Sequence, residues 1–186
     1  MSGILEAALQ MELSAAALAR LHDSMSARTA VQTLLAAGET QDGLKLLARL
    51  LPKPYVVAWL CQCARDEPLQ IEDKAGAALA EAWLRDPSEA NRRAAFEFAN
   101  AGGYKSVGTW LAATAGWSGG SLAPATQETP VPPPDHLTAR AAVAAVNMMA
   151  ALVVDQFAVR RDALISRALH LLNSGDTPAF IKKGVG

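Results

Sequence analysis

The stretch LTARAAVAAVNMMAALVV, residues 137–154, decides the fold class of this chain. Its last fourteen residues contain no charged side chain, and apolar residues cover nearly every face of the helix that they would form. A helix that is apolar almost all round belongs at the centre of a bundle. A bilayer span needs roughly 20 apolar residues, so we expect a buried core helix and no membrane insertion.

The limits of this central helix follow from its polar neighbours. Asp135 stands just before it and is expected to cap its first turn. After it come Phe157 and the polar residues Arg160-Arg161-Asp162. The pattern leaves open whether the helix continues through them to Leu172, and a bend near Arg160 is one possibility.

The rest of the chain has the composition of an all-α protein. Alanine and leucine are abundant, aromatic residues make up 5% of the 186 residues, and no stretch alternates apolar and polar residues between turns. We predict seven to nine helices in a single domain over residues 1–186. Besides the central helix, helical patterns cover 5–21, 27–37, 41–51, 52–65, 66–85, 86–101 and 107–114, and Asp86 is expected to cap the second last of these.

Two arrangements of these helices remain open. A Trp-Leu pair recurs late in three successive helical segments, at Trp59, Trp83 and Trp110, with spacings of 24 and 27 residues. Such spacings fit one helix plus one turn and are shorter than the roughly 34 residues of a helix-pair repeat. The pattern is compatible with a compact multi-helix bundle or with a short irregular α-solenoid.

The charge of the chain argues against nucleic acid as a partner. Seventeen basic and eighteen acidic residues give a formal net charge of −1, and the basic residues are scattered without interleaved aromatic residues. The opening MSGILEAALQMEL carries acidic residues where an export signal needs an unbroken apolar run. Cys61 and Cys63 would point about 200° apart on a helix, which disfavours a disulfide between them. We therefore expect a cytoplasmic protein.

Catalysis needs titratable groups that lie close together, and the sequence pattern does not assemble them. The three histidines, His22, His136 and His170, lie at expected helix ends and have no spacing that would place two metal ligands on one helical face. Cys61 and Cys63 are typical of small buried side chains. The sequence predicts no catalytic residue, no metal and no cofactor.

Residues 117–134 form a long connection before the central helix. A structureless connection of this length is unusual in a compact domain unless it packs or binds. Glycines permit a chain reversal near its start, and the proline run near its end is extended and stiff. It is interpreted first as a surface strap that packs across the domain. Alternatively it docks to a partner protein, with these candidate contact residues: Trp117, Leu122, Pro132, Pro133 and Pro134.

A specific pattern of tryptophans, a helix cap and a proline run covers about a third of the chain. It consists of Trp83, Asp86-Pro87-Ser88, Arg92, Ala94, Trp110-Leu111-Ala112, Trp117-Ser118-Gly119-Gly120-Ser121-Leu122-Ala123-Pro124, Val131-Pro132-Pro133-Pro134 and Leu137-Thr138-Ala139-Arg140. This pattern resembles an uncharacterised family of bacterial all-helical proteins, a domain of unknown function. The resemblance implies a bacterial cytoplasmic accessory protein that accompanies secretion clusters, including type VI systems, and it implies no catalytic residues.

These observations lead us to expect a non-enzymatic protein-binding accessory protein, such as an adaptor, a scaffold or a chaperone-like factor. Its protein partner and its oligomeric state are not indicated. A small ligand-binding bundle or an enzyme is one alternative, and it would need a polar pocket at the central helix with convergent groups such as His136, Arg140 and Asn147. A toxin-immunity protein is another, although a strongly charged face, which would favour it, is not visible.

Overall fold

The structure is a computed structural model that describes residues 3–173 of the chain. These residues form ten α-helices and one 3-10 helix and contain no strand, so the predicted all-α class is confirmed. The helices are α1 (Ile4–Gln10), α2 (Ala15–Leu18), α3 (Ala27–Ala36), α4 (Thr40–Leu50), α5 (Lys53–Arg65), α6 (Ile71–Arg85), α7 (Glu89–Ala101), α8 (Val107–Gly116), α9 (Leu137–Ala150), α10 (Phe157–Leu169) and the 3-10 helix η1 (His170–Asn173). The domain expected over residues 1–186 includes chain ends that lie outside the described range.

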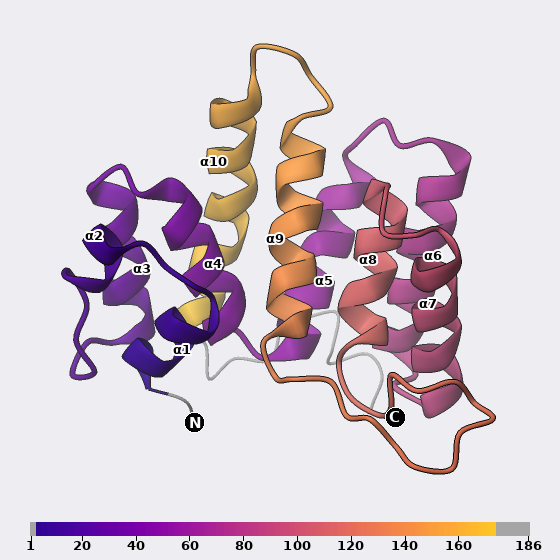
Figure 1. The fold of residues 1–186 in the computed structure, drawn as a ribbon. Coiled ribbons are helices and arrows are strands. Elements are labelled where there is room, and N and C mark those ends of the chain that lie inside the picture. Colours follow the sequence, from indigo (N-terminus) through magenta and orange to yellow (C-terminus); the bar gives the residue numbers. More distant parts are fainter. Residues whose placement is uncertain (1–2, 174–186) are drawn as a thin grey trace.

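The helices form a bundle around α9. Figure 1 shows α1 to α4 on one side, the antiparallel pair α9 and α10 in the middle, and α5 to α8 on the other side. Helix α9 packs against α4, α5, α8 and α10, and two of these, α4 and α5, are not its neighbours in the sequence. In a solenoid each unit contacts only adjacent units, so the bundle is the arrangement that the chain adopts.

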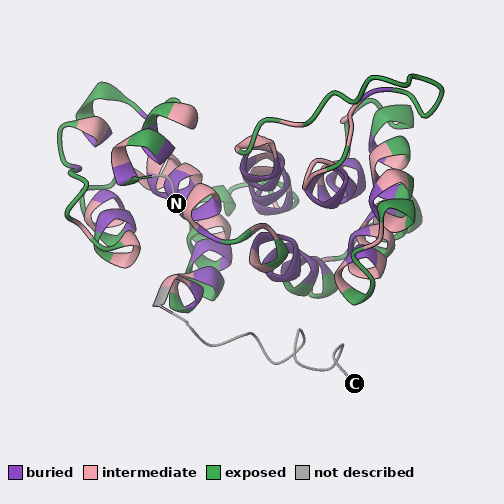
Figure 2. Cartoon of the chain, turned by 90° about the horizontal axis from the view of Figure 1, so that it is seen from below, coloured by how far each residue is buried: buried purple, intermediate pink, exposed green. Residues whose placement is uncertain are grey.

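The buried residues lie where these helices face one another. Helices α5, α8 and α9 bury residues around most of their circumference. Figure 2 shows the buried residues gathered on inward-facing helical surfaces and the exposed residues around the outside. The core position predicted for the apolar helix is confirmed. Within residues 3–173, every helix is too short or too polar to cross a bilayer.

The helix predicted over residues 5–21 is divided into α1 and α2, which is one reason why the structure has more helices than expected. Glu12 follows α1 with a φ of 54°, a left-handed conformation that cannot continue a helix. The Ser14 side chain then accepts a hydrogen bond from the Ala17 backbone N–H at 3.1 Å and caps α2. Position Glu12 is held by α9 and α4, because its carboxylate and its carbonyl accept hydrogen bonds from Arg140 and Lys45.

The central helix ends earlier than the two continuations that the sequence left open. Helix α9 stops at Ala150, and the chain reverses over residues 151–156 instead of continuing or bending near Arg160. Asp155 has a φ of 67°, which breaks the helical path. The Arg160 guanidinium donates hydrogen bonds to the carbonyls of Met149 and Ala150, at 3.0 and 3.3 Å. Arg160 thus satisfies the last carbonyls of α9, and α10 runs back beside it.

Two predicted caps are wrong by one or two residues. Asp135 does not cap α9, because His136 takes the N-cap position and the Asp135 carboxylate binds the Lys53 ammonium at 3.1 Å. Asp86 does not cap α7, because Ser88 occupies the N-cap and its hydroxyl accepts from the Asn91 backbone N–H. The Asp135 carboxylate is captured by a distant side chain, that of Lys53. The Asp86 carboxylate instead accepts hydrogen bonds from the side chains of Ser88 and Asn91 at the start of α7.

Candidate interaction surface

The first half of the 117–134 segment is fastened to α7 and α8. The buried Arg92 side chain donates hydrogen bonds to the carbonyl of Gly116 at 2.6 Å and to that of Ser121 at 3.2 Å. Arg93 donates to the carbonyl of Ala123 at 2.7 Å. Gly120 has a φ of 64°, and a Cβ there would lie 2.4 Å from the Arg92 Nε. A glycine is therefore required where the chain passes over this arginine.

The five sequence-predicted contact residues occupy different environments within this segment. Trp117 is half-buried, and its ring centroid lies 5.2 Å from that of Tyr104 and 5.9 Å from that of Trp110. Leu122 is half-buried, and its backbone N–H donates to the carbonyl of Val131 at 2.8 Å. Pro132 and Pro134 are exposed, whereas Pro133 is half-buried. The structure brings Trp117 into an aromatic cluster and leaves two prolines facing solvent, so both interpretations of the segment stay predictions.

The polar groups suggested for a pocket at the central helix have separate partners. The Arg140 guanidinium donates to the Gln10 carbonyl at 3.0 Å and to the Glu12 carboxylate at 2.9 Å. The Asn147 amide donates to the Gln41 side chain at 3.3 Å. The pKa of His136 is lowered mainly by burial and secondly by the positive charge of Arg140. These three side chains do not converge on one cavity. The cavity beside Thr138 and Ala139 at the start of α9 has a volume of about 10 Å³, which is the space of roughly one water molecule.

Both cysteines are buried and free, on α5. Burial raises the pKa of each thiol to about 12. A thiol with such a pKa is protonated at neutral pH, and the thiolate is the form that attacks electrophiles or binds metals. Cys61 and Cys63 therefore act as small apolar side chains. Within residues 3–173 no group of three or more histidine, cysteine, aspartate or glutamate side chains is placed to hold a metal ion.

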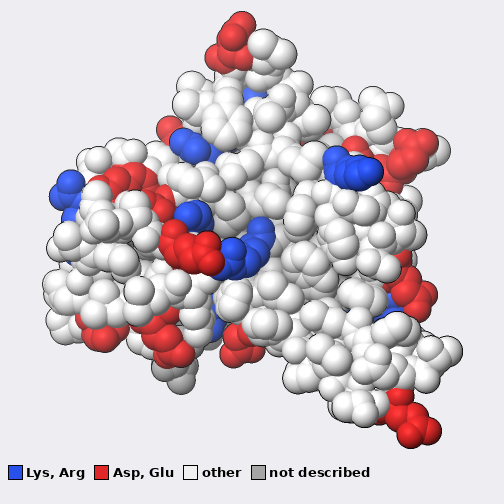
Figure 3. Space-filling model, viewed as in Figure 1, with Lys and Arg blue, Asp and Glu red and all other residues white. Residues whose placement is uncertain are grey.

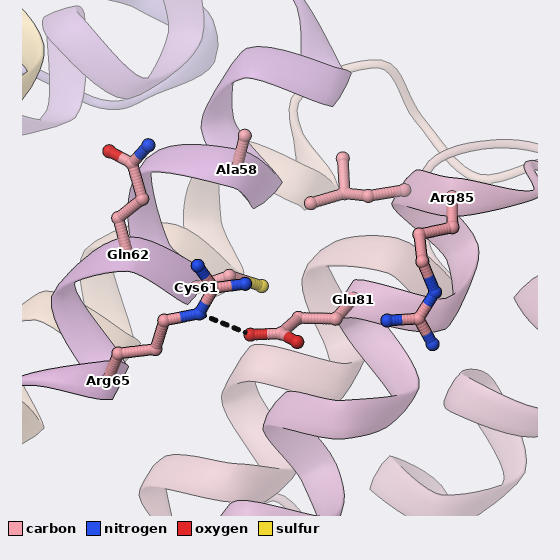
Figure 4. A pocket seen from close by; sticks show the side chains of 7 residues that line it. Ala58, Cys61, Gln62, Arg65, Glu81 and Arg85 are labelled. Carbon is pink, nitrogen blue, oxygen red and sulfur yellow. Dashed lines mark hydrogen bonds and ion pairs between the residues drawn. The ribbon is translucent and has the colours of Figure 1, made fainter. Parts of the chain in front are cut away.

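A groove runs between α5 and α6, on either side of an ion pair. Arg65 Nε lies 2.9 Å from Glu81 Oε1, and Figure 4 shows these two side chains reaching toward each other from the two helices. Two pockets of about 140 and 290 Å³ flank the pair. We call this surface the α5–α6 groove, and its lining residues are Ala58, Cys61, Gln62, Ala64, Arg65, Glu67, Leu69, Lys74, Ala77, Ala78, Glu81, Leu84 and Arg85.

The most exposed group of large apolar side chains lies at the turn between α9 and α10. Leu152, Val154, Phe157 and Val159, which we call the hairpin tip, are 42%, 81%, 37% and 74% exposed. Figure 1 shows this turn projecting beyond the ends of the neighbouring helices. Figure 3 shows acidic atoms at the summit of the projection and mostly uncharged atoms around them. Apolar residues gathered on a protrusion are typical of an interaction surface.

The hairpin tip stands on a rigid base. The Trp59 indole N–H donates to the carbonyl of Leu164 at 2.9 Å in the core, which ties α10 to α5. Arg160 binds the end of α9 and the carboxylate of Glu67. The Arg161 guanidinium lies over the Phe157 ring, 5.0 Å from its centroid, a favourable cation–π contact. These contacts hold the exposed apolar residues in place instead of allowing them to fold back.

Sequence reasoning missed the hairpin tip because it assigned residues 141–154 to one buried helix. The apolar character of Leu152 and Val154 is the same as that of the buried residues before them, so composition does not distinguish the two groups. A signal was present in Asp155, since aspartate tolerates the left-handed backbone better than most residues. An aspartate directly after an apolar run is compatible with a turn, and a turn at this position would expose the residues on either side of it.

The chain was compared with protein families, curated proteins and solved structures. The model of a family of unknown function, DUF6931, matches residues 30–172 of this chain. No curated protein and no solved structure matches the chain.

Proposed function

We propose that this chain, which belongs to the DUF6931 family of unknown function, is a non-enzymatic protein-binding accessory protein. It acts as an adaptor, a scaffold or a chaperone-like factor, and it uses the hairpin tip to contact its partner. The all-helical family expected from the tryptophan, cap and proline pattern agrees with the family match, whose range includes the whole of that pattern.

The observation that carries this proposal is the exposure of the hairpin tip. Four large apolar side chains within eight residues leave water-exposed surface whose burial by a partner would be favourable, at about 25 cal/mol per Å² of apolar area. Isolated exposed apolar residues are ordinary on protein surfaces, whereas clustered ones mark interaction sites. The contacts of Arg160 and Trp59 hold the tip in a fixed conformation, which lowers the entropy cost of docking.

The setting of this activity comes from the resemblance to bacterial helical proteins that accompany secretion clusters. We place the protein in the bacterial cytoplasm, beside the components of a secretion system such as a type VI machine. The expected partner presents a hydrophobic groove that accepts the hairpin tip. The exposed prolines Pro132 and Pro134 form a second candidate contact, and Trp117 and Leu122 support it through the aromatic cluster and the backbone of the same segment.

The experiment that tests the proposal is affinity capture of the tagged protein from its native cells, followed by mass spectrometry. Val154→Asp places a charge on the most exposed residue of the tip, and we expect it to abolish recovery of the partner while the chain stays folded. Leu9→Asp is the matched control, because Leu9 is also a strongly exposed aliphatic residue, 64%, but lies on α1. A partner that both variants recover as well as the wild type would overturn the role of the tip.

A second comparison separates the tip from the proline segment. The double variant Pro132→Ser with Pro134→Ser changes exposed residues without removing a described hydrogen bond. If this variant loses the partner and Val154→Asp retains it, the contact lies in the 117–134 segment and the sequence-based site prediction holds. Recovery of no protein by any form of the chain, with a small molecule co-purifying, would contradict the proposed function itself.

A further inference from the structure

We propose that the hairpin tip docks into the α5–α6 groove of a second copy of this chain, and that two copies form a dimer through two reciprocal contacts. The proposal rests on the proposed function, because it names a partner for the same protein-binding surface. Three features of the structure support it: the charge of the tip, the charge of the groove, and the start of the groove beside the base of the hairpin.

The hairpin tip combines apolar side chains with unpaired negative charge. Asp155 and Asp162 are exposed, and within residues 3–173 neither carboxylate has an ion pair or a hydrogen bond. Arg160 binds Glu67 and Arg167 binds Asp66 at 2.7 Å. Arg161 lies over Phe157 and keeps its positive charge, so two unpaired carboxylates stand against one cation at the tip. The charge that the tip offers to a partner is therefore negative, and a complementary surface is apolar with a basic border.

The α5–α6 groove has these two properties. Its floor includes the apolar side chains of Ala58, Leu69 and Leu84. Lys74 and Arg85 stand exposed at its border, and among the described residues neither has an ion pair or a side-chain hydrogen bond. The other charges of the groove are neutralised in pairs, Arg65 with Glu81 and Glu67 with Arg160. The groove therefore offers unpaired positive charge beside pockets that can receive aliphatic side chains.

The groove begins beside the base of the hairpin and runs from there along α6 to Arg85. Glu67, which lines the groove, binds Arg160 at the base of the hairpin, and Figure 1 shows the connection between α5 and α6 at the end where the hairpin projects. The hairpin is held upright by this ion pair, so its tip cannot reach the groove of its own chain. A two-fold axis between adjacent complementary patches brings each tip to the other groove, and such an isologous contact closes as a dimer.

The test uses charge reversal and sedimentation velocity of the full chain, from micromolar to millimolar concentration. The tip variant combines Asp155→Asn, Gln156→Lys and Asp162→Lys, and the asparagine keeps a residue that tolerates the left-handed backbone of position 155. The groove variant combines Lys74→Glu and Arg85→Glu. We expect the wild type to dimerise and each variant alone to dimerise at least about tenfold more weakly, because like charges then face each other in both contacts.

Mixing the two variants gives the decisive result. In the mixed pair each tip faces a groove of opposite charge, so we expect a heterodimer of wild-type affinity. Val154→Asp should weaken association by about tenfold or more in the wild-type background, because it removes apolar burial from the contact. Leu9→Asp, on α1, should leave it unchanged. Circular dichroism of every variant establishes that it is folded.

The proposal fails if the wild type is monomeric at all these concentrations, if the mixed variants do not pair, or if long polymers form in place of dimers. A monomeric chain that still loses a cellular partner through Val154→Asp would overturn self-docking and leave the proposed function intact. A dimer with the expected variant behaviour that recovers no other protein from cells would support self-docking and overturn the adaptor role.

Discussion

Arg92 shows how one buried charge organises a connection that has no secondary structure. It is 3% exposed, and its guanidinium binds the Glu89 carboxylate, the end of α8 at Gly116 and the following turn at Ser121. The carbonyls at a helix C-terminus are partly negative and lack intrahelical partners. An arginine can satisfy several of them at once because its donors form a rigid planar fork.

Replacing Arg92 should therefore weaken the fold. We expect Arg92→Ala to lower the free energy of unfolding by about 2 to 3 kcal/mol, since it leaves buried carbonyl groups without donors. Urea unfolding followed by circular dichroism measures the change. Arg85→Ala is the matched control, because Arg85 is exposed and its loss should cost less than about 0.5 kcal/mol. Equal stability of the two variants would show that the arginine network does not hold the segment.

At the scale of the helices, two glycines allow α6 and α8 to touch. A Cβ on Gly76 would lie 2.1 Å from the Gly108 carbonyl oxygen, and a Cβ on Gly108 would lie 2.4 Å from the Asp73 Cα. The obstacles are backbone atoms, which cannot rotate away as a flexible side chain can. The Asp73 carboxylate also accepts a hydrogen bond from the Gly108 backbone N–H at 2.7 Å and so binds the start of α8.

The close crossing predicts a strong effect of a single methyl group. Gly76→Ala should lower the free energy of unfolding by about 3 kcal/mol or more, although alanine is the better helix former, because the helices must move apart. Gly119→Ala serves as the control, since a Cβ there meets nothing within 4 Å. It should change stability by less than about 1 kcal/mol, in either direction. Thermal and chemical unfolding of the two variants distinguish the cases, and a neutral Gly76→Ala would contradict the packing.

Some helix limits follow from the local sequence pattern, whereas others depend on the tertiary structure. The ranges expected for α3, α4 and α5 agree with the structure to within a residue or two, because Gly38 and Pro52 mark their limits with backbone preferences that need no context. The sequence pattern did not predict the end of α9 or the break after α1. Both depend on side chains far away in the sequence, Arg160 for the first and Arg140 with Lys45 for the second.

At the scale of the whole molecule, titration is expected to weaken the fold at low pH. Hydrogen bonds from arginine or lysine lower the pKa of three carboxylates in the folded chain, and burial lowers that of His136. The carboxylate pairs are Glu12 with Arg140, Glu89 with Arg92 and Asp135 with Lys53. A group whose pKa is lower in the folded chain binds its proton more readily when unfolded, so protonation favours unfolding.

The melting temperature should therefore be highest above the ordinary histidine value of 6.5 and should fall in two stages as the pH decreases. The first stage belongs to His136, and the second begins near the ordinary carboxylate values of 4.5 and 3.8. Calorimetry between pH 8 and pH 3 measures the profile. His136→Gln should remove the first stage and leave the second, whereas a melting temperature that rises on acidification would contradict the assigned pKa directions.

The candidate surface was less predictable than the fold. Trp117 and Leu122 are candidate contacts because apolar side chains in a long connection need a partner. For Trp117 the structure supplies one inside the chain, in the rings of Tyr104 and Trp110. Val154 belongs to the apolar run that predicts a buried helix, and it is exposed. The hydrophobicity of a side chain indicates that its burial is favourable, but it does not indicate which surface will bury it.

The sequence by itself determined the all-α class, the central apolar helix and the family, because helical periodicity, chain-breaking glycines and prolines, and the tryptophan and proline pattern are local properties. Only the tertiary structure decided that α9 reverses into α10, that Arg92 and Arg160 bind the ends of α8 and α9, and that the four apolar side chains of the hairpin tip are exposed. Those outcomes depend on contacts between residues distant in the chain. Burial, hydrogen-bond satisfaction and charge pairing are settled only when such residues meet.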